Sequence, residues 1–149
     1  MAHAQQQILE AVRSILATGA TAAGSNVYLD RVDAVPPNLL PAILVDESAE
    51  GETVTLNTMA SIEERALGVS ITCVAAHGTE AVARSRDLGL QVEKLLAASA
   101  TLRSLCKLGV QITGSRPVVS EDKDRLIASR AQDWRMTYMV AAEAPDQIL

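Results

Sequence analysis

The densest group of chemically capable side chains is the segment "DESAEGE", which holds Asp46, Glu47, Glu50 and Glu52. Carboxylates this close together can transfer protons or bind a hard cation. Their spacing is not that of a calcium loop, and the glycine stands at the wrong position for one. A tight turn explains the segment better, because Gly51 supplies the backbone angles that turns require. We therefore predict a solvated hairpin turn and no metal site.

Other side chains with catalytic potential lack companions. The two imidazoles are His3, near the amino terminus, and His77, after an apolar segment, and neither has an evident orienting partner. Residues 104–107 (SLCK) and 120–123 (SEDK) match Ser-x-x-Lys, but no companion motif accompanies them. We expect a protein that is not an enzyme, with no catalytic residue and no cofactor.

Length and composition favour one domain over residues 1–149, in which roughly 70% of the unfolded surface can be buried. The chain is 48% hydrophobic but has no Phe, one Trp and two Tyr. Its core must therefore consist mainly of Ala, Val, Ile and Leu. Such a core is thin, and we expect association with neighbouring copies to add stability.

Charge and cysteine usage limit the possible partners and compartment. A net charge of −5 argues against a general nucleic-acid coat or a membrane-surface protein. Ten Arg against three Lys favour protein interfaces. Cys73 and Cys106 have no partner motif and fit a reducing compartment. Without an export signal or a run of ~20 apolar residues, we expect a cytosolic protein that has no membrane partner.

Hydrophobic periodicity predicts the elements that position these side chains. Apolar residues at helical spacing indicate two amphipathic helices, at residues 5–17 and 80–98. Alternating or continuous apolar runs indicate strands at residues 27–32, 42–46, 52–59, 66–76 and 110–114, at 116–120 as an option, and within 125–143, followed by a tail at 144–149. Successive strands joined by short turns imply an α+β fold, a mostly antiparallel sheet flanked on one side by two main helices.

Two finer predictions concern packing. In residues 66–76, Leu67, Val69, Ile71 and Cys73 share one face, and the residues between them share the other. In the last strand, one face is shared by Trp134, Met136, Tyr138 and Val140. Gly89, in the second helix, lacks a side chain and allows close approach of helix and strand.

The order of these elements resembles the tail terminator (tail completion) proteins of long-tailed bacteriophages and of phage-like gene transfer particles. The resemblance covers nearly the whole chain. It is carried by the N-terminal helix, "NVYLDRVDAVPPNLLPAILVDESAEGE", the strand "RALGVSITCVAA", the helix "EAVARSRDLGLQVEKLLAA" and the closing strand "WRMTYMVAA". It rests on order, length and the "LPAILV" strand entry, not on a catalytic signature.

The resemblance implies a small α+β subunit of a six-membered ring at the head-proximal end of the tail tube. Such a ring stops tube growth and offers the surface that joins the head connector, while DNA passes through its lumen without specific binding. The implied partners are other copies of the chain, the tail tube protein and the head–tail connector or adaptor. Assembly in the host cytoplasm and a place in the tail of the particle, at the neck, are implied as well.

A head-to-tail ring needs two different complementary patches on each subunit. The candidates are the edge-strand residues and Arg31 after them, the leucines of the following loop, and three arginines as pairing groups. These are Val27, Leu29, Arg31, Leu39, Leu40, Arg65, Arg116 and Arg130. Asp46, Glu47, Glu50 and Glu52 either face ordinary solvent or line the lumen, where they would repel phosphate.

Two other classes of protein remain open at this stage. A head-closure or adaptor ring of the neck has the same size and site of assembly, and the position of the ring in particles separates it from a tail terminator. A small cytosolic ligand-binding domain requires an enclosed pocket with convergent polar groups.

Overall fold

The two predicted helices are confirmed, and a third follows them. The structure, a computed structural model, describes residues 2–57, 59–76, 78–118 and 127–149. Helix α1 spans Ala4–Thr18 and α2 spans Ala81–Ala98. The short α3 (Ala100–Leu105) was not predicted. It begins because the Ser99 hydroxyl accepts a hydrogen bond from the Leu102 amide, which is an N-terminal cap.

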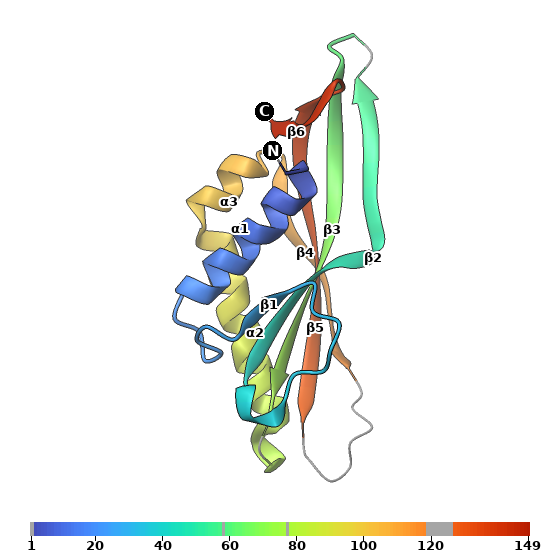
Figure 1. Ribbon diagram of the computed structural model, residues 1–149. Helices are drawn as coiled ribbons and strands as arrows, with labels where there is room; N and C mark the ends of the chain where they lie inside the picture. Colours follow the sequence, from blue (N-terminus) through green and yellow to red (C-terminus); the bar gives the residue numbers. More distant parts are fainter. Residues whose placement is uncertain (1, 58, 77, 119–126) are drawn as a thin grey trace.

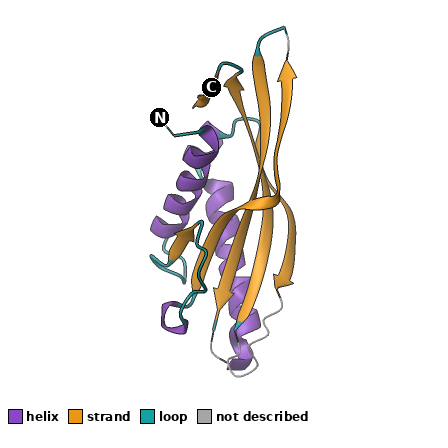
Figure 2. Cartoon of the chain, turned by 45° about the vertical axis from the view of Figure 1, so that its right-hand side comes forward, coloured by secondary structure: helices purple, strands orange, loops and turns teal. Residues whose placement is uncertain are grey.

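Six strands form one sheet, and the predicted α+β class is confirmed. Their order is β1-β2-β3-β5-β4, with β6 paired to β5. All neighbouring strands are antiparallel except β1 and β2, which are parallel. The bounds are β1 Val27–Leu29, β2 Ala42–Asn57, β3 Ile62–Ala75, β4 Gly109–Val118, β5 Ala128–Ala141 and β6 Ala144–Ile148. Figures 1 and 2 show all three helices on one face of this sheet, with the other face open.

The core lies between the helices and the covered face of the sheet. The predicted alternation is confirmed on β3, where Leu67, Val69, Ile71 and Cys73 are fully buried. It is also confirmed on β5, whose Trp134, Met136, Tyr138 and Val140 are buried on the side that α2 covers. These side chains form one apolar cluster with the buried faces of the helices.

The predicted turn at residues 47–51 is wrong, because β2 is one long strand. It pairs with β3 on both sides of this segment, so the hairpin lies instead between β2 and β3. Residues 48–51 form a bulge opposite the single residue Gly68. The bulge adds three residues to β2, and because three is an odd number, the alternation of side chains inverts across it. Before the bulge, the odd-numbered Ile43 and Val45 face the helices. After it, the even-numbered Glu52 faces them, on the same side of the sheet as Leu67.

Two predicted boundaries are also corrected. The first strand is short: β1 ends at Leu29, because Asp30 has a left-handed backbone angle (φ 53°) that breaks the extended conformation. The predicted tail at 144–149 contains β6, which pairs with the end of β5. His77, residues 119–120 of the optional strand, and the segment 120–123 lie outside the described residues.

Gly89 makes the close helix–strand contact that its sequence position predicts. It is buried against β5, where the Gln132 side-chain amide donates a hydrogen bond to the Gly89 carbonyl at 2.9 Å. The side-chain oxygen of Gln132 accepts a hydrogen bond from the Trp134 indole at 3.1 Å. A side chain at position 89 would begin 3.0 Å from the Gln132 amide nitrogen.

Gly68→Ala tests how tightly the bulge packs. An added Cβ would lie 2.1 Å from the Ser48 hydroxyl oxygen and 3.0 Å from the Gly51 carbonyl oxygen. We expect a loss of about 1–3 kcal/mol in the free energy of unfolding, measured in urea, because the bulge must move. Gly114→Ala, also in a strand, is the control, since its nearest new contact is an ordinary 3.8 Å. Equal losses in the two variants would contradict this account.

Candidate assembly interface

The sheet ends in two open edges on opposite sides. One edge is formed by β1 and by the part of β2 that extends beyond β1, because β1 pairs only with Ile43, Leu44 and Val45. The other edge is formed by β4 and, at the end of β5 that β4 does not reach, by β6. Unpaired strand edges present rows of backbone donors and acceptors to other chains. The two sides of the subunit therefore offer different surfaces for contact.

The predicted interface residues of the first edge lie together. Val27 is buried in the core, and Leu29 packs against it, so both side chains are directed into their own subunit. Arg31 follows β1 and stacks on the Tyr28 ring, 4.6 Å from its centroid. The Arg31 Nε also donates to the Asp33 carbonyl at 3.1 Å.

Leu39 and Leu40 lie beside this edge, in the loop that leads to β2. Leu39 ends a short 3-10 helix (Pro37–Leu39), and both side chains are half-buried. The Asn26 side-chain amide donates to the Leu39 carbonyl at 3.0 Å, which attaches this loop to the start of β1. The loop and β1 thus form one continuous surface.

Arg116 lies on the opposite edge strand, and Arg130 lies on its inner neighbour β5. Arg116, on β4, is exposed and forms an ion pair with Asp133 of β5. The Arg130 Nε donates to the Ser115 hydroxyl at 2.8 Å. The structure therefore separates the predicted interface residues into two groups at the two edges, and Arg65 belongs to neither.

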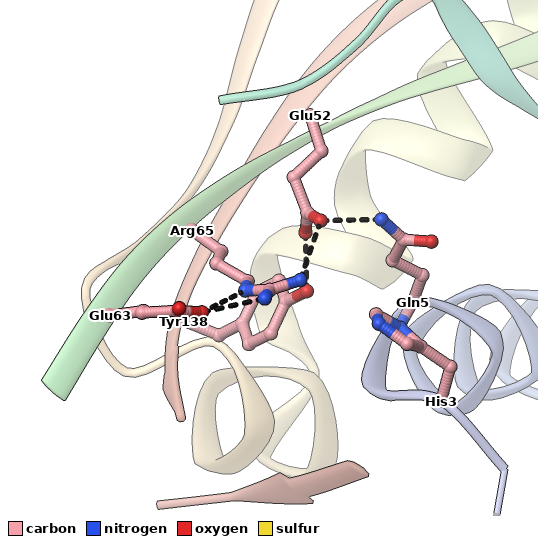
Figure 3. A network of polar contacts seen from close by, with 6 residues as sticks. All are labelled: His3, Gln5, Glu52, Glu63, Arg65 and Tyr138. Carbon is pink, nitrogen blue, oxygen red and sulfur yellow. Dashed lines mark hydrogen bonds and ion pairs between the residues drawn. The ribbon is translucent and has the colours of Figure 1, made fainter. Parts of the chain in front are cut away.

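Arg65 and Glu52 form a polar network under the β2–β3 hairpin, as Figure 3 shows. The Glu52 carboxylate accepts hydrogen bonds from the Tyr138 hydroxyl and from the Gln5 side-chain amide of α1. It also pairs with the Arg65 guanidinium at 3.3 Å, while Glu63 accepts from Arg65 at 2.6 and 2.9 Å. The Glu52 side chain is 6% exposed.

The prediction that Glu52 is solvated or lines the lumen is therefore wrong. The bulge turns Glu52 onto the covered face of the sheet, where it cannot be a solvated or lumen-lining carboxylate. Arg65 forms ion pairs with two carboxylates of its own chain, and its predicted role at an interface stays a prediction. The sequence contains one usable signal, because Glu52 begins the alternating run that continues with Val54 and Leu56.

Burial and charge set the protonation states in this network. Burial raises the pKa of the Tyr138 hydroxyl, and its hydrogen bond to Glu52 raises it further. Burial opposes the charge of Arg65, but the contacts with Glu63 and Glu52 outweigh that effect and raise its pKa overall. Tyr138 is thus a neutral donor and Arg65 a permanent cation, which suits a structural link better than proton transfer.

Asp46, Glu47 and Glu50 lie on and around the bulge. Glu47 and Glu50 are exposed, and Asp46 is half-buried. All three border a groove of about 710 Å³ on the open face of the sheet, whose other side carries Arg116 and Arg135. The groove is open and mixed in charge. No group of three or more candidate metal ligands is present among the described residues.

Sequence analysis missed an apolar surface at the hairpin. Val54 and Leu56 are on the helix side of β2, yet they are 51% and 52% exposed because the hairpin projects beyond the helices (Figure 1). Met59, next to the tip, is 98% exposed. The alternation predicted which face these side chains share, but it contains no information on where the helix layer ends.

The remaining reactive side chains have structural positions. Cys73 and Cys106 are free and buried, and burial raises the pKa of each thiol to about 12. His3 caps α1, with its Nδ1 accepting from the Gln5 amide at 3.1 Å. The Ser104 hydroxyl donates to the Thr101 carbonyl inside α3.

Across the described ranges, no helix has the length and apolar character to span a membrane. A comparison with models of known protein families and a search of curated proteins both found no match. Conclusions about function therefore rest on the chain itself.

Tyr138→Phe tests the buried network. It removes the hydroxyl that donates to Glu52 and leaves a buried carboxylate oxygen without that donor. We expect a loss of about 1–3 kcal/mol in the free energy of unfolding, measured in urea. Tyr28→Phe is the matched control, because that hydroxyl makes only a long, 3.4 Å contact at the sheet edge. A loss no larger than the control's would show that the network does not stabilise the fold.

Asp46→Asn tests the electrostatics of the bulge. Burial, and then the nearby Asp30, raise the pKa of the Asp46 carboxyl above its usual 3.8. The stability that this shift contributes is fully present below pH 3.8 and is lost as the pH rises through the higher folded-state value. The variant should therefore melt at a higher temperature than the wild type at pH 7, with the gain disappearing at about pH 3. Glu47→Gln, at the exposed neighbour, should show no such gain; a gain for Asp46→Asn that is the same at both pH values would contradict the assignment.

Proposed function

We propose that the protein is a structural subunit that assembles head-to-tail into a ring, and that this ring is the tail terminator of a phage or phage-like particle. The observation that carries the ring is the pair of open sheet edges on opposite sides of the subunit. A cyclic, heterologous assembly uses two different patches in just this way. A two-fold dimer would instead pair one patch with itself.

The place in the tail is supported by the sequence resemblance and by the confirmed α+β architecture with its helices on one face. The proposed ring would sit on the head-proximal end of the tail tube, end tube growth and bind the head connector. DNA would pass through its lumen without specific binding, which the net charge of −5 favours. Assembly would take place in the host cytoplasm.

The projecting hairpin suits contact with a second component. Val54, Leu56 and Met59 are exposed there. The hairpin extends beyond the helix layer along the strand direction (Figure 2). A subunit that uses its edges for its neighbours keeps this hairpin available for the tube or the connector. Clustered exposed apolar side chains mark such contact sites.

The test uses the tail tube protein from the same genome. Tubes polymerising from that protein in the presence of this chain should be shorter in negative-stain images, and each capped tube should carry a ring at one end. Light scattering of the ring should give about six times the subunit mass of 15.8 kDa. Unchanged tube length and bare tube ends would overturn the tail-terminator proposal. Binding to the head connector instead would identify the ring as an adaptor of the neck.

A further inference from the structure

Charge is divided unequally between the two edges of the sheet. Residues 27–57, which form the β1–β2 side, contain six acidic residues and one basic residue, Arg31. Residues 99–118, which form α3 and β4, contain three basic residues and no acidic one. We call the exposed acids of the first segment the acidic edge; they are Asp30, Asp33, Glu47 and Glu50. The basic edge consists of Arg103, Lys107 and Arg116.

We propose that the acidic edge of one copy binds the basic edge of the next copy, and that this contact is the repeating interface of the assembly. Like edges repel when they face each other, so the charges disfavour a two-fold pair and favour a head-to-tail arrangement. The inference shares with the proposed function only the requirement for self-association. It does not depend on a place in a phage tail.

Strand direction is compatible with this contact. Since β2, β3, β5 and β4 are antiparallel in turn, β2 and β4 run in opposite directions. A neighbouring copy displaced sideways therefore brings its β4 alongside β1 and the part of β2 beyond β1. This β4 runs antiparallel to both, because β1 is parallel to β2. No rotation about the strand direction is needed beyond the curvature of a ring.

The bulges of the two edges also lie at the same position along the strand direction. The sheet register places Glu47 in one row with Val69, Trp134 and Ile112. The acidic bulge of β2 thus lies level with the bulge of β4, which falls between Ile112 and Gly114. Lys107 precedes this point by five residues and Arg116 follows it by four. A sideways displacement without any vertical shift sets the acidic bulge between the two basic side chains.

Both bulges interrupt the row of backbone donors and acceptors along their edges. They therefore disfavour pairing of these edges with strands of unrelated chains. Side-chain charge is then left to select the partner edge. Arg116 already shares its charge with Asp133, so Arg103 and Lys107 are the less committed cations. In this arrangement Glu47 and Glu50 lie at the contact between subunits, not in the lumen.

Charge reversal with complementation tests the interface. The acid-reversed variant is Glu47→Lys with Glu50→Lys, and the base-reversed variant is Arg103→Glu with Lys107→Glu. In the first variant two lysines face the basic edge of the next copy, and in the second two glutamates face its acidic edge. Each variant alone should therefore stay at the subunit mass in light scattering, at concentrations where the wild type associates. An equal mixture should associate again, because each reversed edge now meets its complement. A six-membered ring can close with alternating copies, since six is an even number.

The controls make the same charge changes on α1 and α2, where no contact is proposed. Glu10→Lys with Asp87→Lys matches the first variant, and Arg86→Glu with Lys94→Glu matches the second; all four side chains are exposed. These controls should associate as the wild type does. Raising the salt concentration from about 50 to 500 mM should weaken wild-type association at least tenfold, because exposed charges are screened.

Three results would overturn the inference. They are association of either reversed variant alone, failure of two folded reversed variants to associate when mixed, and a wild type that stays monomeric at low salt up to about 100 µM. Circular dichroism establishes that each variant is folded. The tube-capping experiment is separate, so a reversed variant that still associates would remove this interface while leaving the tail-terminator proposal to its own test.

Discussion

The bulge at residues 48–51 is the constraint on which the rest of the structure depends. It inserts an odd number of residues into β2, so the side chains after it change faces. Without that inversion, Glu52 would lie on the open face, and the network that joins Gln5 of α1 to Tyr138 of β5 and Arg65 of β3 could not form. Gly68 makes room for the bulge, because the Ser48 hydroxyl occupies the space of a side chain.

The same bulge links the fold to the proposed assembly. On its covered side it directs Glu52 into the protein, and on its outer side it presents Glu47 and Glu50 to solvent at the sheet edge. A single irregularity thus separates Glu52, which holds the hairpin to the helix layer, from Glu47 and Glu50, which are exposed. The hairpin beyond it keeps a defined position relative to α1, although no helix covers its end (Figure 1).

Sequence alone predicted the elements whose pattern is long and regular. The alternation in β3 and β5 and the helical spacing in α1 and α2 determine which side chains are buried, because a one-residue slip would expose a whole apolar face. The segment "ESAEG" was misassigned, because a turn and a bulge use the same residues: Gly51 has a positive φ of 67°, which both structures accept. The pairing of the flanking strands decides between them, and that pairing is not local.

The candidate interface was predictable in part, for related reasons. The sequence alone does not show whether an arginine or glutamate is exposed to solvent or pairs with a side chain from another strand. Arg65 and Glu52 are 13 positions apart and become partners only through the β2–β3 register. The sequence shows the division of charge between residues 27–57 and 99–118. Only the topology shows that these segments lie at opposite edges of one sheet. Strand order could not be derived from periodicity.

Weak contacts between edges are consistent with a closed ring as the end state. Exposed ion pairs contribute about 0–1 kcal/mol each, so two copies joined by one such interface are held loosely. An open chain of copies has one contact fewer than it has subunits, whereas a closed ring has as many contacts as subunits. The closing contact forms within one assembly, at a high effective concentration, and favours the ring over every open intermediate. A long, flat apolar edge would bind strongly in pairs but would also aggregate without limit. Bulged edges of opposite charge avoid that outcome, and they restrict strong association to the geometry in which all the contacts form together.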